Sequence, residues 1–497
     1  MKRIVVVGID GGSWNILKPM CDRNELKGLK KIIENGSWGF LESTLPPLTA
    51  PAWVSFYTGK NPGKHGIFDF VKLENGKMKL NRSKDVKGKA IYEVLSNYGI
   101  RSVIIALPLS FPPKIDFNGI MISDFLYPQK EVYPKGSIDL SNYSVYSDPN
   151  KSGEELIKDV IETTRSQVEL GKKVFSEEDW QFFFILFRET DTILHNFWGE
   201  IKNGNSRLLE VFKLVDEFLA WVIERIEDDT TVFVVSDHGF SDYDYLVRIN
   251  KIFHDKNLLE PKIVKKEETS ILETHVKSAF GTEKRRLRIP KIFYKILLYS
   301  KTSTIAKKIY RLVFKGREVS YLVRVDYEKS KAYVLTPLSS TIYLKDSGDY
   351  DRTFHEVLRL LSILEYQGKK VVKKVFTKND VYSGACLNDA PDFIVVTNGF
   401  ILDSGIVGET FERFSQGGYH SLQGIFAAYG KNIKRGEVNA KIYDLFPTIL
   451  YALDLPIPED VDGRVLVEIF DEKKDVKHTS NKESEKIRKA ISKLKKI

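Results

Sequence analysis

Short apolar runs alternate with longer amphipathic stretches over most of the chain. The apolar runs are rich in β-branched and aromatic residues and predict strands at residues 4–9, 102–106, 182–187, 231–235, 393–396 and 425–428. Stretches with helical periodicity include residues 26–34, 90–97, 153–173 and 206–226. Because fully apolar strands that alternate with helices form sheets with both faces covered, the pattern predicts an α/β fold around a mostly parallel central sheet.

Two regions depart from this pattern. Residues 332–344 contain two short alternating runs, which predict a hairpin or a small side sheet. Residues 250–330 interleave basic and apolar side chains, which indicates an amphipathic basic insertion. We therefore expect an α/β core in two parts, residues 1–249 and 331–470, with the insertion between them and a basic tail at 471–497.

The composition supports a folded core and excludes several classes of protein. With 42% hydrophobic and 12% aromatic residues, the chain is not globally disordered. Two cysteines, Cys21 and Cys386, are too few for a disulfide framework or a Cys-rich zinc module. The first apolar run ends at Asp10 without a cleavage pattern, and no run approaches the roughly 20 residues that span a bilayer. We expect a cytoplasmic protein, either soluble or peripherally bound to a membrane.

The net charge of +9 is distributed unevenly. Residues 277–317 contain 13 Lys and Arg and one acid, a net charge of +12, and the tail at 471–497 has a net charge of +5. The rest of the chain therefore carries a net charge of −8. The total alone suggests a protein that binds nucleic acid or an anionic surface, whereas the distribution indicates an acidic body with two basic appendages.

Three of the predicted strands end in, or just before, an aspartate: Asp10, Asp191 and Asp237. The carboxyl ends of parallel strands gather at one edge of a sheet, where ligands bind. Three carboxylates at that edge repel one another unless cations neutralise them. Taken alone, Asp10 before two glycines is equally well explained as the cap of a turn. Together, the three aspartates predict a cation site.

Histidines accompany two of these aspartates, and another follows a glycine-rich signal. His195 lies four residues after Asp191, which places both on one helix face; that spacing suits metal ligands but also an ordinary exposed polar pair. His238 directly follows Asp237, and two adjacent side chains that point differently from a strand end suit two adjacent metal ions. We expect His420 to lie in a glycine-rich loop.

A proline-rich segment at residues 46–56 carries a candidate nucleophile. It predicts that Thr49 lies at a helix N-terminus, with Pro51 in the first turn. One interpretation is that Thr49 is only the N-cap of that helix. The other is that its hydroxyl faces an anion site made by the helix dipole and free N–H groups.

Taken together, these motifs resemble the alkaline phosphatase superfamily, and most closely its type I phosphodiesterase/nucleotide pyrophosphatase branch. The resemblance covers residues 1–250 and 385–470 and leaves out the basic insertion. The motifs occur in the family's order: Asp10, the Thr49 loop with Thr58-Gly59 and Asn61-Pro62-x-x-His65-Gly66-Ile67, Asp191-x-x-x-His195, Asp237-His238-Gly239, Gly418-x-His420, and Asp462-Gly463-Arg464 after Asp444-Leu445-Phe446-Pro447-Thr448.

The resemblance implies an alkaline phosphatase-like fold with two divalent metal ions, zinc or alternatively manganese. The implied ligands are, for one ion, Asp191, His195 and His420, and for the other, Asp10, Asp237 and His238. Such mixed nitrogen and oxygen ligands leave open positions for catalysis. The implied reaction is hydrolysis of a phosphodiester or pyrophosphate through a covalent phosphothreonine at Thr49, with the two ions stabilising the attacking and leaving oxygens.

The chain departs from the family at one position. Nucleotide pyrophosphatases usually carry an asparagine that donates a hydrogen bond to the phosphoryl oxygen, and Phe70 occupies that register here. The departure bears on nucleotide specificity more than on phosphoryl transfer. Cys21 lacks the Cys/Ser-x-Pro-x-Arg context of sulfatases, and cofactor-independent phosphoglycerate mutases have a different ligand series.

Several functions remain open at this stage. The same residues suit a phosphomonoesterase, a phosphonate hydrolase or a phosphotransferase, and a non-catalytic scaffold that binds an anionic surface is an alternative of another class. The expected partners are a phosphate-ester substrate and, through residues 277–317, an anionic membrane surface or polyanionic substrate, unless that segment is a solvated lid. No signature predicts specific nucleic-acid recognition, and no pattern indicates an oligomeric state.

Overall fold

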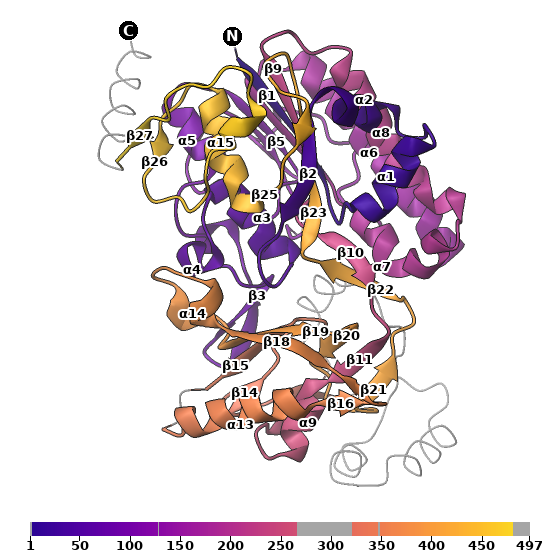
Figure 1. Ribbon diagram of the computed structural model, residues 1–497, viewed down its shortest axis with the longest axis vertical. Coiled ribbons are helices and arrows are strands. Elements are labelled where there is room, and N and C mark those ends of the chain that lie inside the picture. Colours follow the sequence, from indigo (N-terminus) through magenta and orange to yellow (C-terminus); the bar gives the residue numbers. More distant parts are fainter. Residues whose placement is uncertain (1, 128, 266–320, 346–347, 481–497) are drawn as a thin grey trace.

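The computed structural model describes residues 2–127, 129–265, 321–345 and 348–480. These residues form a larger α/β body and a smaller part made mainly of antiparallel strands (Figure 1). The described residues do not include the basic segment at 277–317 or the end of the tail from residue 481. The expectations for these two segments therefore stay predictions.

The larger body is built on a ten-stranded sheet. Its middle consists of parallel strands, in the order β9 (Thr230–Val235), β1 (Arg3–Ile9), β8 (Phe182–Phe187), β5 (Ser102–Ile105) and β6 (Gly119–Ile122). Every residue of β5, β6 and β8 is buried. A strand buried on both faces needs apolar side chains on both, which explains the continuous apolar runs. The predicted mostly parallel sheet is confirmed.

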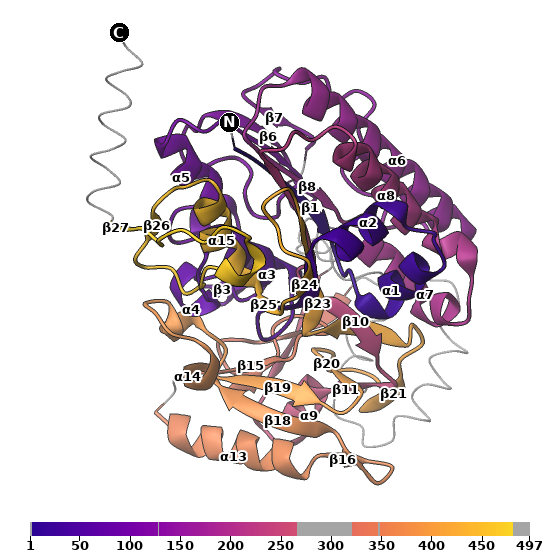
Figure 2. The same ribbon diagram turned by 45° about the horizontal axis from the view of Figure 1, so that its top comes forward.

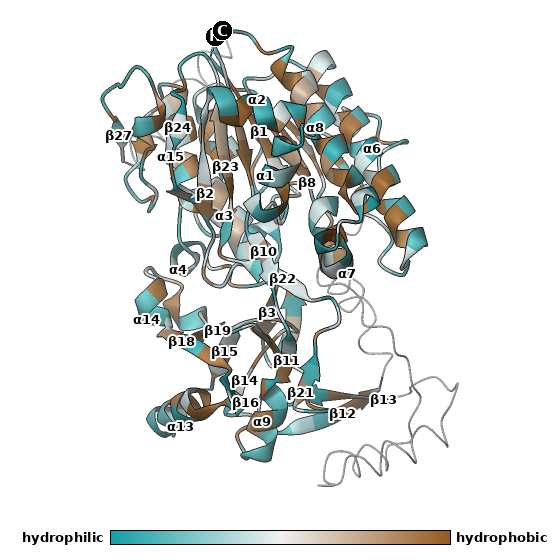
Figure 3. Cartoon of the chain, turned by 45° about the vertical axis from the view of Figure 1, so that its right-hand side comes forward, coloured by the Kyte–Doolittle hydropathy of each residue, from teal (hydrophilic) through white to brown (hydrophobic). Residues whose placement is uncertain are grey.

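Helices cover both faces of this sheet (Figure 2). One face carries α1 (Trp14–Asp22), α2 (Lys27–Asn35), α6 (Glu154–Glu177), α7 (Glu189–Lys202) and α8 (Glu210–Ile223). The other face carries α3 (Thr49–Thr58), α5 (Ile91–Asn97) and α15 (Leu445–Ala452). The strands enclosed between these helices are strongly hydrophobic (Figure 3), so the main core lies on both sides of the sheet.

A late segment of the chain completes the sheet. Strand β23 (Gln423–Tyr429) lies between β9 and β2 (Ser37–Glu42) and runs antiparallel to both. Two short strands, β24 (Gly436–Glu437) and β25 (Ala440–Lys441), then pair with β2. The strand predicted at residues 425–428 is therefore present, with its direction reversed relative to its neighbour β9.

The smaller part has a hydrophobic core of its own. Its main sheet has the order β14 (Ala332–Tyr333), β15 (Thr341–Leu344), β19 (Phe393–Thr397) and β18 (Val372–Thr377), and the β14–β15 pair confirms the predicted hairpin. The run at residues 393–396, expected in the parallel sheet, is β19 of this antiparallel sheet instead. That assignment was wrong because β19 is covered on both sides, by α13 (Tyr350–Ile363) and by a small apolar cluster, and so is as apolar as a central strand.

A two-stranded ribbon projects from the smaller part (Figure 3). Strand β12 (Pro261–Lys265) pairs antiparallel with β13 (Tyr321–Val325), and the last residue of β12 pairs with the first of β13. The two ends of the segment at residues 266–320 are thus adjacent. The boundaries expected at residues 250 and 330 enclose this ribbon and stay a prediction.

Candidate metal centre

The seven candidate site residues lie at the carboxyl edge of the parallel strands, and all are buried. Asp10 follows β1, and α7, which begins two residues after β8, carries Asp191 and His195. Asp237 and His238 connect β9 to β10 (Gly239–Asp242). The remaining two are Thr49, the first residue of α3, and His420, on β22 (Gly418–Ser421).

His420 lies on a strand rather than in the loop expected from the sequence. Strand β22 pairs antiparallel with β10, and His420 is opposite Phe240. The glycine that suggested a loop has a packing role, because a Cβ on Gly418 would come within 2.2 Å of the Trp198 ring. Trp198 lies on α7, so this close approach brings β22 and its histidine against the helix that carries Asp191.

The first group consists of Asp191, His195 and His420. Asp191 Oδ1 lies 3.3 Å from His195 Nε2 and 3.5 Å from His420 Nε2, and the two nitrogens are 2.8 Å apart. Two ligand atoms on one tetrahedral zinc ion lie about 3.4 Å apart. The distances from the Asp191 oxygen to the two nitrogens match this spacing, whereas the two nitrogens lie closer to each other.

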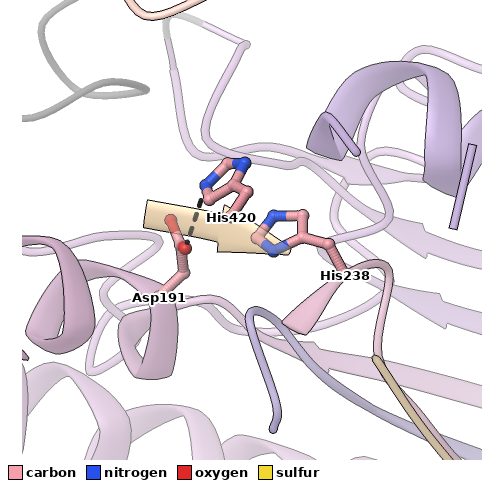
Figure 4. A group of neighbouring side chains, drawn as sticks. All are labelled: Asp191, His238 and His420. Carbon is pink, nitrogen blue, oxygen red and sulfur yellow. Dashed lines mark ion pairs between the residues drawn. The ribbon is translucent and has the colours of Figure 1, made fainter. Parts of the chain in front are cut away.

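The second group consists of Asp10, Asp237 and His238. His238 Nε2 lies 3.2 Å from Asp237 Oδ2 and 3.8 Å from Asp10 Oδ1. The His238 ring stacks on His420, with centroids 3.5 Å apart, so the two groups adjoin. Figure 4 shows Asp191, His238 and His420 pointing toward one another, and these three also satisfy the ligand spacing of a metal site.

The hydrogen bonding of the carboxylates shows whether this cluster fits cations. Within the described chain, Asp10 Oδ1, Asp191 Oδ1 and Asp237 Oδ2 are buried and accept no hydrogen bond. The other oxygen of Asp10 accepts from Trp53 Nε1, and that of Asp237 from the Gly11 amide, each at 3.2 Å. Since a buried carboxylate oxygen without a partner is costly, the three atoms that face the imidazoles fit bound cations.

Backbone carbonyls fix the tautomer of two of the imidazoles. His420 Nδ1 lies 2.9 Å from the Pro47 carbonyl, and His238 Nδ1 lies 3.2 Å from the Gly239 carbonyl. A carbonyl only accepts, so each Nδ1 carries the hydrogen and each Nε2 keeps its lone pair. This is the tautomer in which Nε2 binds a metal.

The pKa values in the cluster follow from burial and crowding. Burial raises the pKa of Asp237 to about 8 and that of Asp10 well above its usual value, and repulsion between carboxylates adds to both shifts. Burial also lowers the pKa of His420 to about 3 and lowers that of His195. Burial acts to raise the pKa of Asp191 as well, but the adjacent histidines outweigh it and lower that pKa. Neutral imidazoles beside crowded carboxylates favour the uptake of a cation.

The Thr49 hydroxyl does not cap helix α3. Helix α3 has Leu48 as its N-cap, and in the described structure no side chain caps it. The Thr49 hydroxyl instead lies 3.2 Å from His238 Nε2, the atom that faces Asp10 and Asp237. The interpretation of Thr49 as the N-cap is therefore wrong, because the hydroxyl turns from its own helix toward the second group.

The family motif around His65 has a structural role. The Ile67 amide donates to His65 Nδ1 at 3.1 Å, so Nε2 carries the hydrogen and donates to Ser55 Oγ at 3.0 Å. This pair ties α3 to α4 (Pro62–His65), whose N-cap is Asn61. Asp462, in the closing segment, accepts from the Asn61 amide at 2.8 Å and so holds the same turn.

Two residues that contact the centre were not found from the sequence. Trp53 holds Asp10, and it lies one helical turn after Thr49, a spacing that the sequence displays once the helix start is known. Thr190 donates from Oγ1 to the Asp10 carbonyl at 2.6 Å and thereby links α7 to the end of β1. No sequence signal distinguishes Thr190 from an ordinary residue in the first turn of a helix.

The fold and the two adjoining groups of acids and histidines define the alkaline phosphatase superfamily. The chain belongs to the type I phosphodiesterase/nucleotide pyrophosphatase family, whose model matches residues 4–399. The chain is thus a member of a metal-dependent enzyme family that hydrolyses phosphate esters, and it contains groups of candidate metal-binding residues. The family resemblance inferred from the motifs is confirmed.

Solved structures share the fold at low sequence identity. Phosphonoacetate hydrolase from Sinorhizobium meliloti, in complex with phosphonoformate, is 15% identical with a TM-score of 0.57; the match covers 91% of this chain and 96% of that one. Human ectonucleotide pyrophosphatase/phosphodiesterase 5 is 14% identical with a TM-score of 0.54, covering 95% and 100%. No curated protein sequence gives a significant match. Among the described residues, no helix is long and apolar enough to cross a membrane.

Proposed function

We propose that the chain hydrolyses a phosphodiester or pyrophosphate, with Thr49 as the nucleophile and two divalent metal ions held by the two groups. One observation carries the proposal: the Thr49 hydroxyl lies 3.2 Å from His238 Nε2 instead of capping its helix. The proposed ligands are Asp191, His195 and His420 for one ion, and Asp10, Asp237 and His238 for the other.

The proposed reaction has two displacements at phosphorus. Two ions bound in such a site polarise the phosphoryl oxygens and favour deprotonation of a nearby hydroxyl. Thr49 Oγ1 forms a bond to phosphorus as the bond from phosphorus to the leaving oxygen breaks, and the proton from Thr49 leaves with the departing alcohol. Water then breaks the Thr49–phosphorus bond, which releases a phosphate monoester and restores the hydroxyl.

The ligand chemistry favours zinc, with manganese as the alternative. Three imidazole nitrogens and three carboxylates make a mixed nitrogen and oxygen set, which suits zinc. In each group two neighbouring ligands from one segment meet a third ligand from another element, and His420 and His238 have the tautomer that leaves Nε2 free for a metal. The metals present after purification are measured directly by elemental analysis.

Phosphonate hydrolysis is the second candidate. The fold is shared with a phosphonoacetate hydrolase, and Phe70 offers no side-chain donor at the register where nucleotide pyrophosphatases usually carry one. A substrate panel of nucleotide diesters, simple diesters, monoesters and phosphonates separates these functions. The proposed diesterase is expected to turn over bis(p-nitrophenyl) phosphate faster than p-nitrophenyl phosphate.

Variants of two threonines on α3 test the nucleophile. Thr49→Ala is expected to lower kcat at least about 1,000-fold with the metal content unchanged, and Thr49→Ser to keep part of the activity. Thr58→Ala is the matched control, because among the described residues the Thr58 hydroxyl donates its hydrogen bond to the Val54 carbonyl in its own helix and to no candidate ligand. Full activity in Thr49→Ala would exclude the phosphothreonine mechanism.

We also propose that the basic segment at residues 277–317 binds an anionic membrane surface. Its net charge of +12 and its interleaved apolar residues are typical of segments that lie on anionic lipid. The proposal rests on the sequence, since this segment is outside the described residues.

A further inference from the structure

A buried hydroxyl next to the candidate metal centre has no partner. Tyr419 immediately precedes His420 on β22, and 5% of its side chain is exposed. Its hydroxyl is shielded from solvent and, among the described residues, makes no hydrogen bond. Buried tyrosine hydroxyls normally find a partner, because an unsatisfied polar group loses its hydration without compensation.

The Tyr419 ring lies against both histidines of the first group. It stacks on His420 with centroids 4.3 Å apart and an interplanar angle of 4°, and it lies 5.2 Å from the His195 ring. The tyrosine is therefore part of the wall of the centre.

Within the described part of the chain, no group accepts a hydrogen bond from the Tyr419 hydroxyl. A phenol hydroxyl is a hydrogen-bond donor, and this one is shielded from bulk water. The nearby carboxylate oxygen, Asp191 Oδ1, faces the two imidazoles instead. A ligand bound in the centre would supply an oxygen acceptor beside this ring, and a phosphoryl group has several.

We infer that the Tyr419 hydroxyl donates a hydrogen bond to a phosphoryl oxygen of the bound substrate. This inference rests on the proposed function, since it assumes that a phosphoryl group occupies the centre. Tyr419 is then a substrate-binding residue supplied by the same strand as His420. It contributes an uncharged donor beside a site where the other proposed contacts are metal ions and a nucleophile.

The variant Tyr419→Phe removes only the hydroxyl, and Tyr143→Phe is its matched control. The Tyr143 side chain is 3% exposed, and within the described residues its hydroxyl is also buried without a hydrogen bond. Tyr143 contacts none of the candidate ligands through any hydrogen bond or ring contact in the described part of the chain. Both variants lose a buried unsatisfied group, so each is expected to keep or raise the thermal stability of the metal-loaded protein.

The decisive measurement is the affinity for inorganic phosphate of the metal-loaded protein, by calorimetry and by inhibition of diester hydrolysis. Tyr419→Phe is expected to weaken phosphate binding about 10- to 100-fold, which is the effect of losing a hydrogen bond to a charged group. Its kcat/KM for bis(p-nitrophenyl) phosphate should fall by a similar factor, with the metal content unchanged. Tyr143→Phe should match the wild type in both.

The outcomes separate this inference from the proposed function. If the wild type hydrolyses the diester and Tyr419→Phe equals it in phosphate affinity and kcat/KM, the inference is overturned and the function stands. Loss of metal from Tyr419→Phe also overturns it, because the tyrosine then acts by holding the histidines. If the wild type hydrolyses no substrate, the function fails, and calorimetry with phosphate still decides whether Tyr419 is a donor.

Discussion

At the residue scale, Asp10 and Asp237 each use their two oxygens differently. One oxygen of each is held by a neutral donor, the Trp53 indole or the Gly11 amide, and the other faces His238. This hydrogen bond restrains each carboxylate, with its second oxygen directed toward His238. Residues that hydrogen-bond to metal ligands commonly influence the affinity for the metal, so we expect the Trp53 indole and the Gly11 amide to do so here.

The first prediction concerns the Trp53 hydrogen bond. Trp53→Phe removes the donor to Asp10 Oδ2 and is expected to lower the affinity for the metal at the second group about 10- to 100-fold. Trp14→Phe is the control, because the Trp14 indole also donates one buried hydrogen bond, to the Gly39 carbonyl, away from the ligands. Competition with a chromogenic chelator measures the affinities. Equal affinities in the two variants would contradict the proposed role of Trp53.

The second prediction concerns Asp124, which lies outside the centre. Burial raises the pKa of Asp124 to about 7, whereas an aspartate in an unfolded chain titrates near about 3.9. Between these values the folded protein keeps a proton that the unfolded chain releases. This group therefore stabilises the fold at low pH, and its contribution is lost as the pH rises from about 4 to 7.

Asp124→Asn tests this dependence. The amide keeps an acceptor for the Leu126 amide, which donates to Asp124 Oδ1 at 2.7 Å, but it has no proton to lose. Between pH 4 and 7 the free energy of unfolding should fall less steeply in the variant, by up to about 1.4 kcal/mol per pH unit. Urea unfolding in the presence of a chelator measures both slopes. Parallel curves for the two proteins would show that Asp124 titrates normally.

At the scale of elements, helix α7 packs closely against Gly418 of strand β22. Gly418 has no room for a Cβ because Trp198 of α7 covers it, and the Trp198 indole is fixed by Asp242 at 2.8 Å. Since α7 also carries Asp191 and His195, a shift of Trp198 that displaces the helix also displaces two proposed ligands of the first group.

The third prediction follows from this contact. Gly418→Ala is expected to destabilise the protein by about 1–3 kcal/mol and to weaken metal binding at the first group, because the tryptophan and its helix are pushed outward. Gly436→Ala is the matched control, since a Cβ at that strand position would have no described atom within 4 Å. Thermal unfolding and metal titration measure the two effects. A Gly418→Ala protein with normal metal affinity would mean that β22 moves instead of α7.

The elements that the sequence predicted well are those with one dominant signal. The buried strands β1, β8 and β9 are continuous apolar runs, and Asp191 and His195 show the helical spacing of four. The errors arose where one pattern has two causes. The apolar run of β19 is equally typical of a central strand of a parallel sheet. The glycines near His420 are typical of a loop, but Gly418 lies on a strand and leaves room for the Trp198 ring.

The remaining contacts of the site depend on distances between segments far apart in the chain. The hydrogen bond from Trp53 to Asp10 and the stacking of Tyr419 on His420 both require the assembled sheet edge. Local propensity contains no information about such pairs. Without an observed arrangement, Tyr419 is one aromatic residue among many.

At the scale of the whole molecule, the β12–β13 ribbon brings the two ends of residues 266–320 next to each other. Because Lys265 and Tyr321 are paired neighbours, a two-residue Asn-Gly turn can replace residues 266–320. The fourth prediction is that this variant folds, keeps its metal content and loses binding to vesicles that contain phosphatidylserine. Neutral vesicles are the control, and vesicle flotation measures binding. Unchanged flotation with anionic vesicles would exclude the proposed membrane role.

The place of β23 in the sheet has a consequence for synthesis of the protein on the ribosome. Strands β2 and β9 are made early, yet the strand that bridges them is Gln423–Tyr429, close behind His420. At typical rates of synthesis, roughly 10 to 40 s pass between β9 and β23. Throughout that interval the nascent chain has two open strand edges, which makes a chaperone that covers them valuable. The insertion of β23 then joins β2 to β9 and brings His420 to the site, so the ligand cluster is completed only after these two strands are bridged.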